Sequence, residues 1–283
     1  MDDIEIRKVR TYSEFEQLIK IQKTVWRHQD IDITPVHQFN VSARTGAILL
    51  GAFLKENMVG FIYSFPAVYN GRIAQHSHQL AVLPEYRGEK IGKKLKWAQR
   101  DNALKMGFDL VAWTTDPLIA RNANLNIHSL GAVAQKYFTE YYQEIPALSI
   151  APSIPMDRFL MEWPIASSRV EERRRREINI KAVDEMPRAL KAKDFDPGIA
   201  DVPNMNLKDD QLLVEIPTNI HEMAQNHIER VRGWRVALRS VMLHYFRLGY
   251  AAVDFNFARH AYFVLKKRGY TSDSGKSGYS VMS

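Results

Sequence analysis

The sequence predicts a mixed α/β fold in which helices flank a mostly antiparallel sheet, with a smaller α/β lobe after it. Apolar runs at 47–55, 58–69 and 73–83 are separated by short polar turns, as in an antiparallel meander. A strand, a sharp turn, a helix and a further strand follow between residues 80 and 113, and this succession indicates a mixed sheet. The chain has 283 residues, of which 46% are hydrophobic, so it can bury a full core.

The elements before the meander follow from the period of the apolar side chains. Residues 4–9 alternate between apolar and charged side chains, which predicts a half-buried strand. Thr11 and Glu14 have the spacing of a helix capping box, so a first helix is expected to begin there. Its apolar side chains recur at helical spacing up to Trp26, and a second helix is expected over 36–43.

Composition excludes several kinds of site and partner. The absence of cysteine excludes disulfides, thiolate metal sites and a cysteine nucleophile. Lys and Arg number 39 against 32 Asp and Glu, and we interpret this excess as a solvated basic face plus a charged linker. A polyanion-binding surface is the alternative, but no zinc-finger, RNA-binding or basic-heptad pattern is present, so nucleic acid is not an expected partner.

The start of the chain and its longest apolar runs bear on the compartment. The first residues are acidic, whereas a secretory signal begins with basic residues followed by apolar ones. Apolar stretches also stay below the roughly 18 consecutive residues typical of a membrane span. We therefore expect a cytoplasmic protein without a membrane partner.

The stretch from Leu80 to Gly92 has the pattern of an anion site. Pro84 ends a buried strand, and Gly88 and Gly92 then stand on either side of the point where a helix must begin. Such a turn exposes backbone N–H groups at the positive end of the helix dipole, which favours a phosphate or pyrophosphate. The helix is expected to end at Gly107. Its expected inner face holds Ile91, Leu95, Ala98, Ala103 and Met106, and its largely outer face holds Lys93, Lys94, Lys96, Arg100 and Asp101.

The run Leu80-Ala81-Val82-Leu83-Pro84-Glu85-Tyr86-Arg87-Gly88, followed by Ile91-Gly92, is similar to the central motif of the GNAT superfamily of N-acetyltransferases. In that motif the loop has the form Arg/Gln-x-x-Gly-x-Gly/Ala. Arg87 and Gly92 match, whereas Lys90 stands where the middle glycine is usual, and this departure bears on the backbone geometry. The predicted order of elements up to about residue 165 is also the GNAT order.

The resemblance implies acetyl-CoA as a cosubstrate, with its pyrophosphate on the loop and its thioester oxygen on a backbone N–H of the preceding strand. The residues so implied are Arg87, Gly88, Glu89, Lys90, Ile91 and Gly92 in the loop and Leu80, Ala81 and Val82 in the strand. The stretch from Asn122 to Ala132 resembles the last motif of the superfamily, which implies that Asn122 or Asn126 binds the pantetheine amides. Ile127 stands where many GNAT enzymes carry a tyrosine near the coenzyme sulfur. Tyr137, Tyr141 and Tyr142 are alternative proton donors, or else packing and rim residues.

The resemblance also places the substrates. In GNAT proteins the fifth strand, here 108–113, splays from the fourth and opens a slot for the pantetheine arm. Trp113 and Thr115 share a strand face and are expected to line this slot. The segment after the first helix commonly lines the acceptor site, so Asp30 and Asp32 are candidates for attracting a cationic amine, with ordinary loop solvation as the alternative.

His76 and His78 are the candidate catalytic residues. They lie on one face of the predicted fourth strand, just before the residues expected to bind the acyl group. Histidine suits a general base because its unperturbed pKa is about 6.5. His78 is the first choice and His76 the second; alternatively, both are hydrogen-bonding residues or shape the acceptor pocket. A metal site at this spacing has no evident third ligand, so no metal is expected.

Composition shifts divide the chain. We predict a GNAT acyltransferase domain over 1–168, a charged linker over 169–178, an accessory α/β lobe over 179–270 and a flexible tail over 271–283. Beyond a strand at 156–165, the expected elements are strands at 178–183, 211–216, 251–257 and 261–265, a long loop at 192–208 and a long helix at 219–248.

The sequence therefore predicts a CoA-dependent N-acyltransferase that moves an acetyl or other short acyl group directly from acyl-CoA to an amine. Direct attack is expected because no cysteine is present to carry the acyl group. The alternative is a catalytically inactive GNAT-fold protein that binds CoA or acts as a regulatory or interaction protein. Lys90 and Ile127 are the departures that favour this alternative. The acceptor is left open because fold does not fix substrate, and so is the oligomeric state.

Overall fold

The computed structural model describes residues 3–27, 29–69, 71–142, 150–151, 153–175 and 185–267. These residues fall into two compact units, which are described separately. The first unit comprises residues 3–113 and 164–166, and the second comprises described residues within 114–163 and 167–267. The units divide after Trp113, inside the predicted N-terminal domain, and the predicted boundary at 168–179 remains a prediction.

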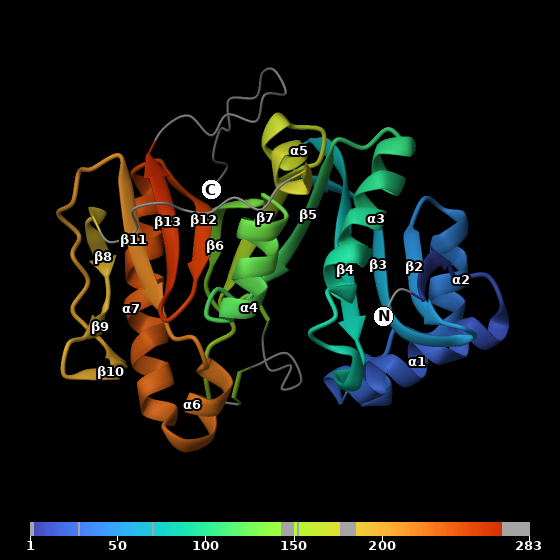
Figure 1. Cartoon of the computed structure of the whole chain (residues 1–283), viewed down its shortest axis with the longest axis horizontal. Coiled ribbons are helices and arrows are strands. Elements are labelled where there is room, and N and C mark those ends of the chain that lie inside the picture. The colour runs from blue at the N-terminus through green and yellow to red at the C-terminus, as the bar shows by residue number, and fades with distance from the viewer. Residues whose placement is uncertain are drawn as a thin grey trace. The chain divides into compact units, whose positions relative to one another are not determined.

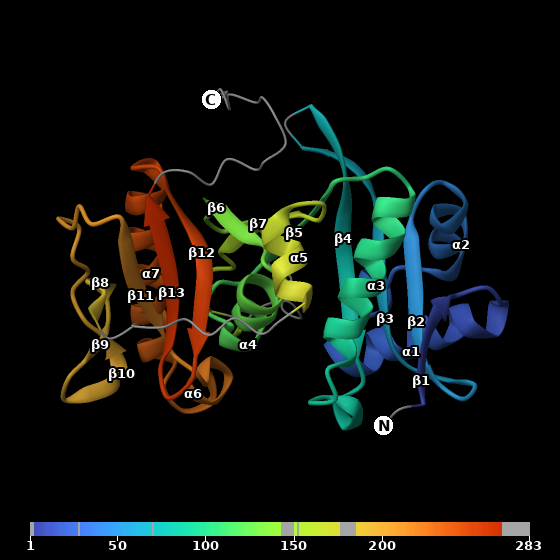
Figure 2. The same ribbon diagram turned by 45° about the horizontal axis from the view of Figure 1, so that its top comes forward.

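The first unit is built on the predicted meander (Figure 1). Its strands follow the order β1 (Ile4–Lys8), β2 (Ile48–Leu54), β3 (Asn57–Tyr69), β4 (Arg72–Val82) and β5 (Leu110–Thr115), of which residues 110–113 belong to this unit. Each of the first four pairs with its neighbour in antiparallel orientation, whereas β4 and β5 are parallel. The mixed, mostly antiparallel sheet flanked by helices is therefore confirmed. Figure 2 shows the long hairpin that β3 and β4 form.

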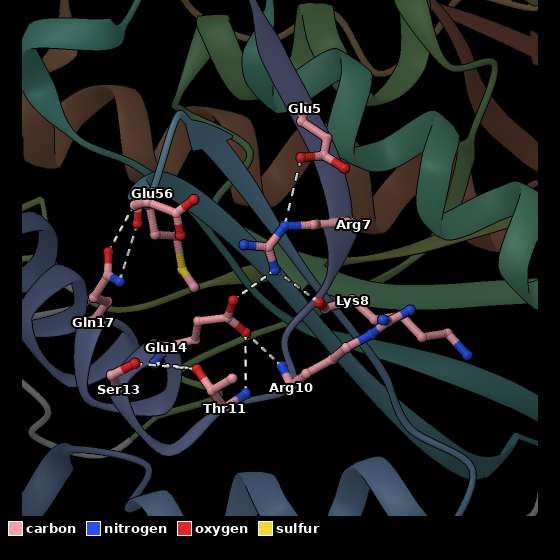
Figure 3. A network of polar contacts seen from close by, with 10 residues as sticks. Glu5, Arg7, Lys8, Arg10, Thr11, Ser13, Glu14, Gln17 and Glu56 are labelled. Atoms are coloured by element: carbon pink, nitrogen blue, oxygen red, sulfur yellow. Dashed lines mark hydrogen bonds and ion pairs between the residues drawn. The ribbon is translucent and has the colours of Figure 1, made fainter.

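The predicted capping box starts helix α1 (Tyr12–Trp26). The Thr11 hydroxyl accepts a hydrogen bond from the Glu14 N–H at 3.3 Å, and the Glu14 carboxylate accepts one from the Thr11 N–H at 3.1 Å. The same carboxylate also accepts from the Arg10 N–H at 2.6 Å and from Arg7 Nη1 at 2.6 Å (Figure 3). This network ties the end of β1 to the start of α1. A second helix, α2, spans Val36–Arg44.

Helices α1 and α2 bury one face of the sheet of the first unit. Phe39 of α2 packs edge-on against Phe61 and Tyr63 of β3, with ring centroids 6.3 and 5.1 Å apart. Burial of such side chains is the main favourable contribution to this core. The cluster comprises Val9, Phe15, Leu18, Ile21, Phe39, Leu49, Phe53, Met58, Phe61, Tyr63 and Ala81.

Helix α3 (Ile91–Lys105) covers the opposite face. A Cβ at Gly92 would meet Leu80 and Val82, whereas Ala81 belongs to the core beneath α1 and α2. Successive strand residues point to opposite faces, so α3 and α1 lie on opposite sides of β4.

The faces of α3 differ in part from the prediction. Ile91, Leu95 and Ala103 are buried as expected, but Met106 is 45% exposed. The outer placement of Lys96 and Arg100 was wrong, because each is only 2% exposed. Lys96 and Arg100 follow Gly92 at four-residue steps, so the three residues form one row on the helix. The aliphatic stems of the two side chains are buried, and their charged ends have hydrogen-bond partners. Arg100 Nε donates to the Ile165 carbonyl at 2.7 Å.

The second unit contains a run of strands in the order β7-β6-β12-β13-β11-β8. Helix α7 supplies buried Trp234 and Tyr245 to this unit. Its elements are α4 (Ala120–Ala123), a π-helix (Asn124–Ser129), β6 (Val133–Phe138), β7 (Arg158–Pro164), α5 (Ser168–Arg175), β8 (Arg188–Leu190), β9 (Ala192–Lys193), β10 (Asp196–Ala200), β11 (Gln211–Ile216), α6 (Ile220–Asn226), α7 (Ile228–Arg247), β12 (Tyr250–Phe257) and β13 (Ala261–Lys267).

Two predictions for this part of the chain were wrong in detail. The predicted long loop contains the β9–β10 hairpin. The long helix is divided at His227, whose backbone φ of −145° is outside the helical range. The predicted strand at 178–183 and the tail at 271–283 lie outside the described residues. In the described ranges, no helix is long and apolar enough to cross a membrane.

Candidate functional site

The two parallel strands β4 and β5 separate after a short ladder. Within the described residues of the first unit, their paired positions are Gln75 with Val111 and His76 with Ala112. Ser77 and Trp113 are therefore the first residues beyond the ladder. Adjacent parallel strands that stop pairing leave main-chain N–H and C=O groups at the open edge, where an extended ligand can bind.

A β-bulge lies on β4 at the same level. Tyr63 pairs with Gln79 and Ser64 with Ser77, so His78 is the extra residue on β4. Bulges redirect side chains and are frequent beside active sites. Here the bulge brings His78 and Gln79 to the face covered by α1, since Gln79 Nε2 donates to Gln22 Oε1 of α1 at 3.1 Å.

The backbone direction selects among the three predicted thioester donors. The Leu83 N–H donates to the Val59 carbonyl of β3 at 2.9 Å. Because N–H groups alternate in direction along a strand, the Ala81 N–H also faces β3. The N–H groups of Leu80 and Val82 face the opposite edge, toward the opening, and are the candidate donors.

The predicted phosphate turn has the geometry of an anion site. A 3₁₀ turn over Pro84–Tyr86 follows β4, and Arg87 and Gly88 then lead into α3. Gly88 has a φ of 92°, a conformation that favours glycine. Among the described residues, no side chain caps the N-terminus of α3. Its first N–H groups and the positive end of the dipole are therefore available to an anion.

Lys90 has a backbone conformation that glycine adopts readily. Its φ and ψ are 58° and 14°, in the left-handed region, and it is the N-cap of α3. The side chain is exposed, as are those of Arg87 and Glu89. The backbone at this position is therefore one that the usual glycine would also accept, and the departure from the motif adds an exposed side chain to the loop.

His76 and His78 lie beside a group of aromatic rings on the face of α1 and α2. The His76 and His78 ring centroids are 6.0 Å apart, and Phe65 lies 5.2 Å from the first and 5.6 Å from the second. The Tyr69 hydroxyl is hydrogen-bonded to His76 Nδ1, and Tyr63 lies 6.0 Å from His78. His76 is half-buried, whereas His78 is exposed.

His76 is poorly suited to act as a base. Burial, together with the nearby charges of His78 and Lys96, lowers the pKa of His76 to about 4. Near neutral pH His76 is therefore uncharged and a weak proton acceptor, suited to hydrogen bonding. The lowered pKa of His76 therefore argues against His76 as the base.

Three polar residues beneath the opening were not predicted to have a functional role. Lys96 Nζ donates to Ser77 Oγ at 2.8 Å and to Gln99 Oε1 at 3.3 Å, and lies 3.6 Å from the Trp113 ring centroid. All four residues are buried. The signal in the sequence was the four-residue step from Gly92 to Lys96, which places Lys96 on the row that faces β4.

Asp30 and Asp32 lie on an exposed 3₁₀ turn in the first unit. The Asp30 carboxylate forms an ion pair with Lys23 at 2.8 Å, which reduces its attraction for a further cation. Their role at an acceptor site remains a prediction.

The other predicted site residues belong to the second unit. Thr115 is buried at the end of β5, Asn122 is exposed on α4, and Asn126 is buried on the π-helix. Ile127 beside it is fully buried. A π-helical turn is rare and often occurs at functional sites. The choice between Asn122 and Asn126 stays open.

Tyr137 has a partner inside the second unit. Its hydroxyl donates to Asp157 at 2.6 Å, and burial raises its pKa above the ordinary value. This arrangement fits the packing role rather than that of a proton donor. Among the described residues, no group of three or more His, Cys, Asp or Glu side chains is arranged to hold a metal ion.

Comparisons with known proteins bear on the first unit and the start of the second. Residues 12–125 match the model of the acetyltransferase (GNAT) family. No curated protein sequence matches the chain.

Similar solved structures include yncA from Salmonella typhimurium with its cofactor acetyl-CoA, the ribosomal-protein-S18-alanine N-acetyltransferase from Escherichia coli, and the paia N-acetyltransferase from Thermoplasma acidophilum with coenzyme A. Their identities are 15, 16 and 19%, with TM-scores of 0.49, 0.46 and 0.40. They cover 57–58% of this chain and 95, 96 and 98% of their own. The family match, rather than these likenesses, identifies residues 12–125 as similar to the acetyltransferase (GNAT) family.

Proposed function

We propose that this protein is a CoA-dependent N-acyltransferase that moves an acetyl or other short acyl group directly from acyl-CoA to an amine. The observation that carries the proposal is the uncapped start of α3 beside the opening between β4 and β5. The pyrophosphate binds the turn from Arg87 to Gly92, and the pantetheine arm runs along the open edge of β4. The thioester oxygen accepts a hydrogen bond from the Leu80 or Val82 N–H.

The chemistry needs few side chains. The amine nitrogen attacks the thioester carbonyl carbon, the C–S bond breaks, and CoA leaves as a thiol after taking up a proton. Holding the two reactants in place supplies a large part of the rate enhancement, up to roughly 7–11 kcal/mol in favourable cases. His78 is the proposed base that removes the proton from the amine. Uncharged His76 helps to position it, because the rings of both histidines pack against Phe65.

Binding of the cosubstrate is tested by calorimetric titration with acetyl-CoA. Gly92→Glu places a carboxylate at the helix N-terminus, where it competes with the pyrophosphate, and we expect the Kd to rise by about tenfold or more. Lys105→Gln, at the exposed C-terminal end of α3, makes the same change in net charge and serves as the control. Equal affinity in both variants would contradict the proposed pyrophosphate site.

The role of His78 is tested by thiol release from acetyl-CoA on a panel of amines. Loss of a general base typically lowers the rate by about 10²–10⁴-fold, and this is the expected effect of His78→Ala. His76→Ala is the matched comparison and should have a smaller effect. An unchanged rate in His78→Ala removes His78 as the base, and binding without release on any amine supports the inactive CoA-binding alternative.

A further inference from the structure

Lys96 reaches the point where β4 and β5 separate. The last ladder pair joins His76 and Ala112, so Ser77 and Trp113 are the residues immediately beyond it. Lys96 Nζ lies 2.8 Å from Ser77 Oγ and 3.6 Å from the centroid of the Trp113 ring. The amine is therefore at the closed end of the opening that the proposed function assigns to the acyl-CoA.

This end of the opening is polar although it is buried. Ser77 is 7% exposed, Lys96 is 2% exposed and Gln99 is fully buried. Gln99 Nε2 donates to Ser77 Oγ at 3.1 Å, so a hydroxyl, an amide and an amine meet at one point. The methyl of an acetyl group gains from apolar contacts, which these groups do not supply.

A carboxylate suits this cluster better than a methyl group. Hydrogen bonds between an ammonium and a carboxylate are roughly twice as strong as neutral ones, and a low local dielectric strengthens them further. Leu80, a candidate thioester donor, pairs with Ile62, and Ser77 pairs with Ser64 two residues along β3, so Leu80 and Ser77 lie about 7 Å apart along the strand direction. An acetyl group has one carbon beyond its carbonyl and does not span this interval, whereas a longer acyl chain extends toward Lys96.

We infer that the transferred acyl group ends in a carboxylate, as in a succinyl or glutaryl group, and that Lys96 selects it. The inference rests on the proposed function, because it names the acyl class that the same slot takes. Lys96 binds the distal end of the acyl chain, away from the bond that breaks. The amine still displaces CoA from the thioester carbonyl, and the terminal carboxylate is retained in the product.

The ionisation of Lys96 is consistent with such a ligand. Burial lowers the pKa of its amine well below the ordinary value. A carboxylate at hydrogen-bond distance favours the charged amine and opposes this shift. A butyryl chain has the same length as a succinyl chain but carries no charge, so it leaves the pKa of Lys96 lowered.

Calorimetric titration with succinyl-CoA, butyryl-CoA and CoA tests the inference without knowledge of the acceptor. The wild-type protein should bind succinyl-CoA about tenfold or more tightly than butyryl-CoA, which corresponds to about 1.4 kcal/mol. Lys96→Met keeps the stem but removes the charge, and this preference should disappear while the Kd for CoA stays nearly unchanged. Replacement of a buried charge by an apolar side chain is often tolerated, so the variant is expected to fold.

Lys105→Met makes the same substitution at an exposed position of α3 and should keep the preference for succinyl-CoA. Equal affinity of the wild-type protein for the two acyl-CoAs overturns the inference, as does a preference that survives in Lys96→Met. In both cases binding of CoA itself leaves the proposed function standing. Absence of binding to all three compounds overturns the proposed function as well.

Discussion

Lys90 shows how a single residue can depart from a motif without changing the backbone. Its φ of 58° places it in the left-handed region, which costs an L-residue roughly 1–2 kcal/mol. Glycine avoids this cost but loses more backbone freedom on folding, by about 0.5–1 kcal/mol. We therefore expect Lys90→Gly to be as stable as the wild type or slightly more so, and Lys90→Val to be less stable by about 1–2 kcal/mol. Denaturant unfolding measures both changes.

The exposed Lys94 provides the matched control. It lies within α3, where helical φ and ψ apply and glycine is unfavourable by about 1 kcal/mol relative to good helix formers. Lys94→Gly should therefore lower stability, opposite in direction to Lys90→Gly. Equal destabilisation by glycine at positions 90 and 94 would contradict the left-handed backbone conformation of Lys90.

The residue types in the sequence predicted where the candidate site lies. They predicted less well how deeply each side chain is buried and which partners it has. The pattern around residues 76–92 indicated the strand, the turn and the helix, because glycine, proline and the apolar period act locally. It did not indicate that Lys96 and Arg100 are buried, since a charged residue is buried only when the fold supplies partners. Those partners, Ser77 and the Ile165 carbonyl, are distant in sequence.

At the scale of elements, α1 depends on the carboxylate of Glu14. Burial alone would raise the pKa of Glu14, but hydrogen bonds from the Arg10 N–H, Arg7 and the Thr11 N–H outweigh it, and the pKa is lowered from 4.5. A depressed pKa in the folded state contributes stability above the unfolded pKa, and this contribution is lost as the pH falls through the folded pKa. The pH dependence of folding should therefore report on this network.

Glu14→Gln is expected to lower the free energy of unfolding by about 1–3 kcal/mol at pH 7, the range for charged hydrogen bonds. The difference from the wild type should shrink as the pH falls below about 4.5, because the wild-type carboxyl then becomes protonated. Urea unfolding at a series of pH values measures this difference. Glu16→Gln, on the exposed side of α1, is the control and should show little effect at any pH. A pH-independent difference for Glu14→Gln would contradict the argument.

Elements with strong local signals were predicted well, and those that depend on distant pairing were not. The capping box fixed the start of α1, and glycine at 107 marked the end of α3. The bulge at His78 was not predicted, because it is defined only by the register with β3. The division of the long helix at His227 was also missed, since the apolar period continues on either side of it.

At the scale of the whole chain, the order of elements predicted the mixed sheet but not the compact units. Antiparallel strands that follow one another along the chain pair locally, so β1 to β4 could be assigned from the sequence. The division after Trp113 follows from which residues contact one another in the folded chain, and no local sequence pattern encodes those contacts. The short Pro164–Ala166 segment illustrates the same point, because it returns to the first unit late in the sequence.

A ligand that binds only the folded chain should stabilise it, and this provides a test at the scale of the molecule. At about 100 times its Kd, a single bound CoA contributes about 2.7 kcal/mol. For a chain of this size we expect the Tm to rise by about 5–10 °C, measured by thermal unfolding with and without CoA. Gly92→Glu should gain little in Tm from CoA relative to its own Tm without CoA, because the introduced carboxylate competes for the anion site. An equal gain in the variant and the wild type would place the bound pyrophosphate away from the start of α3.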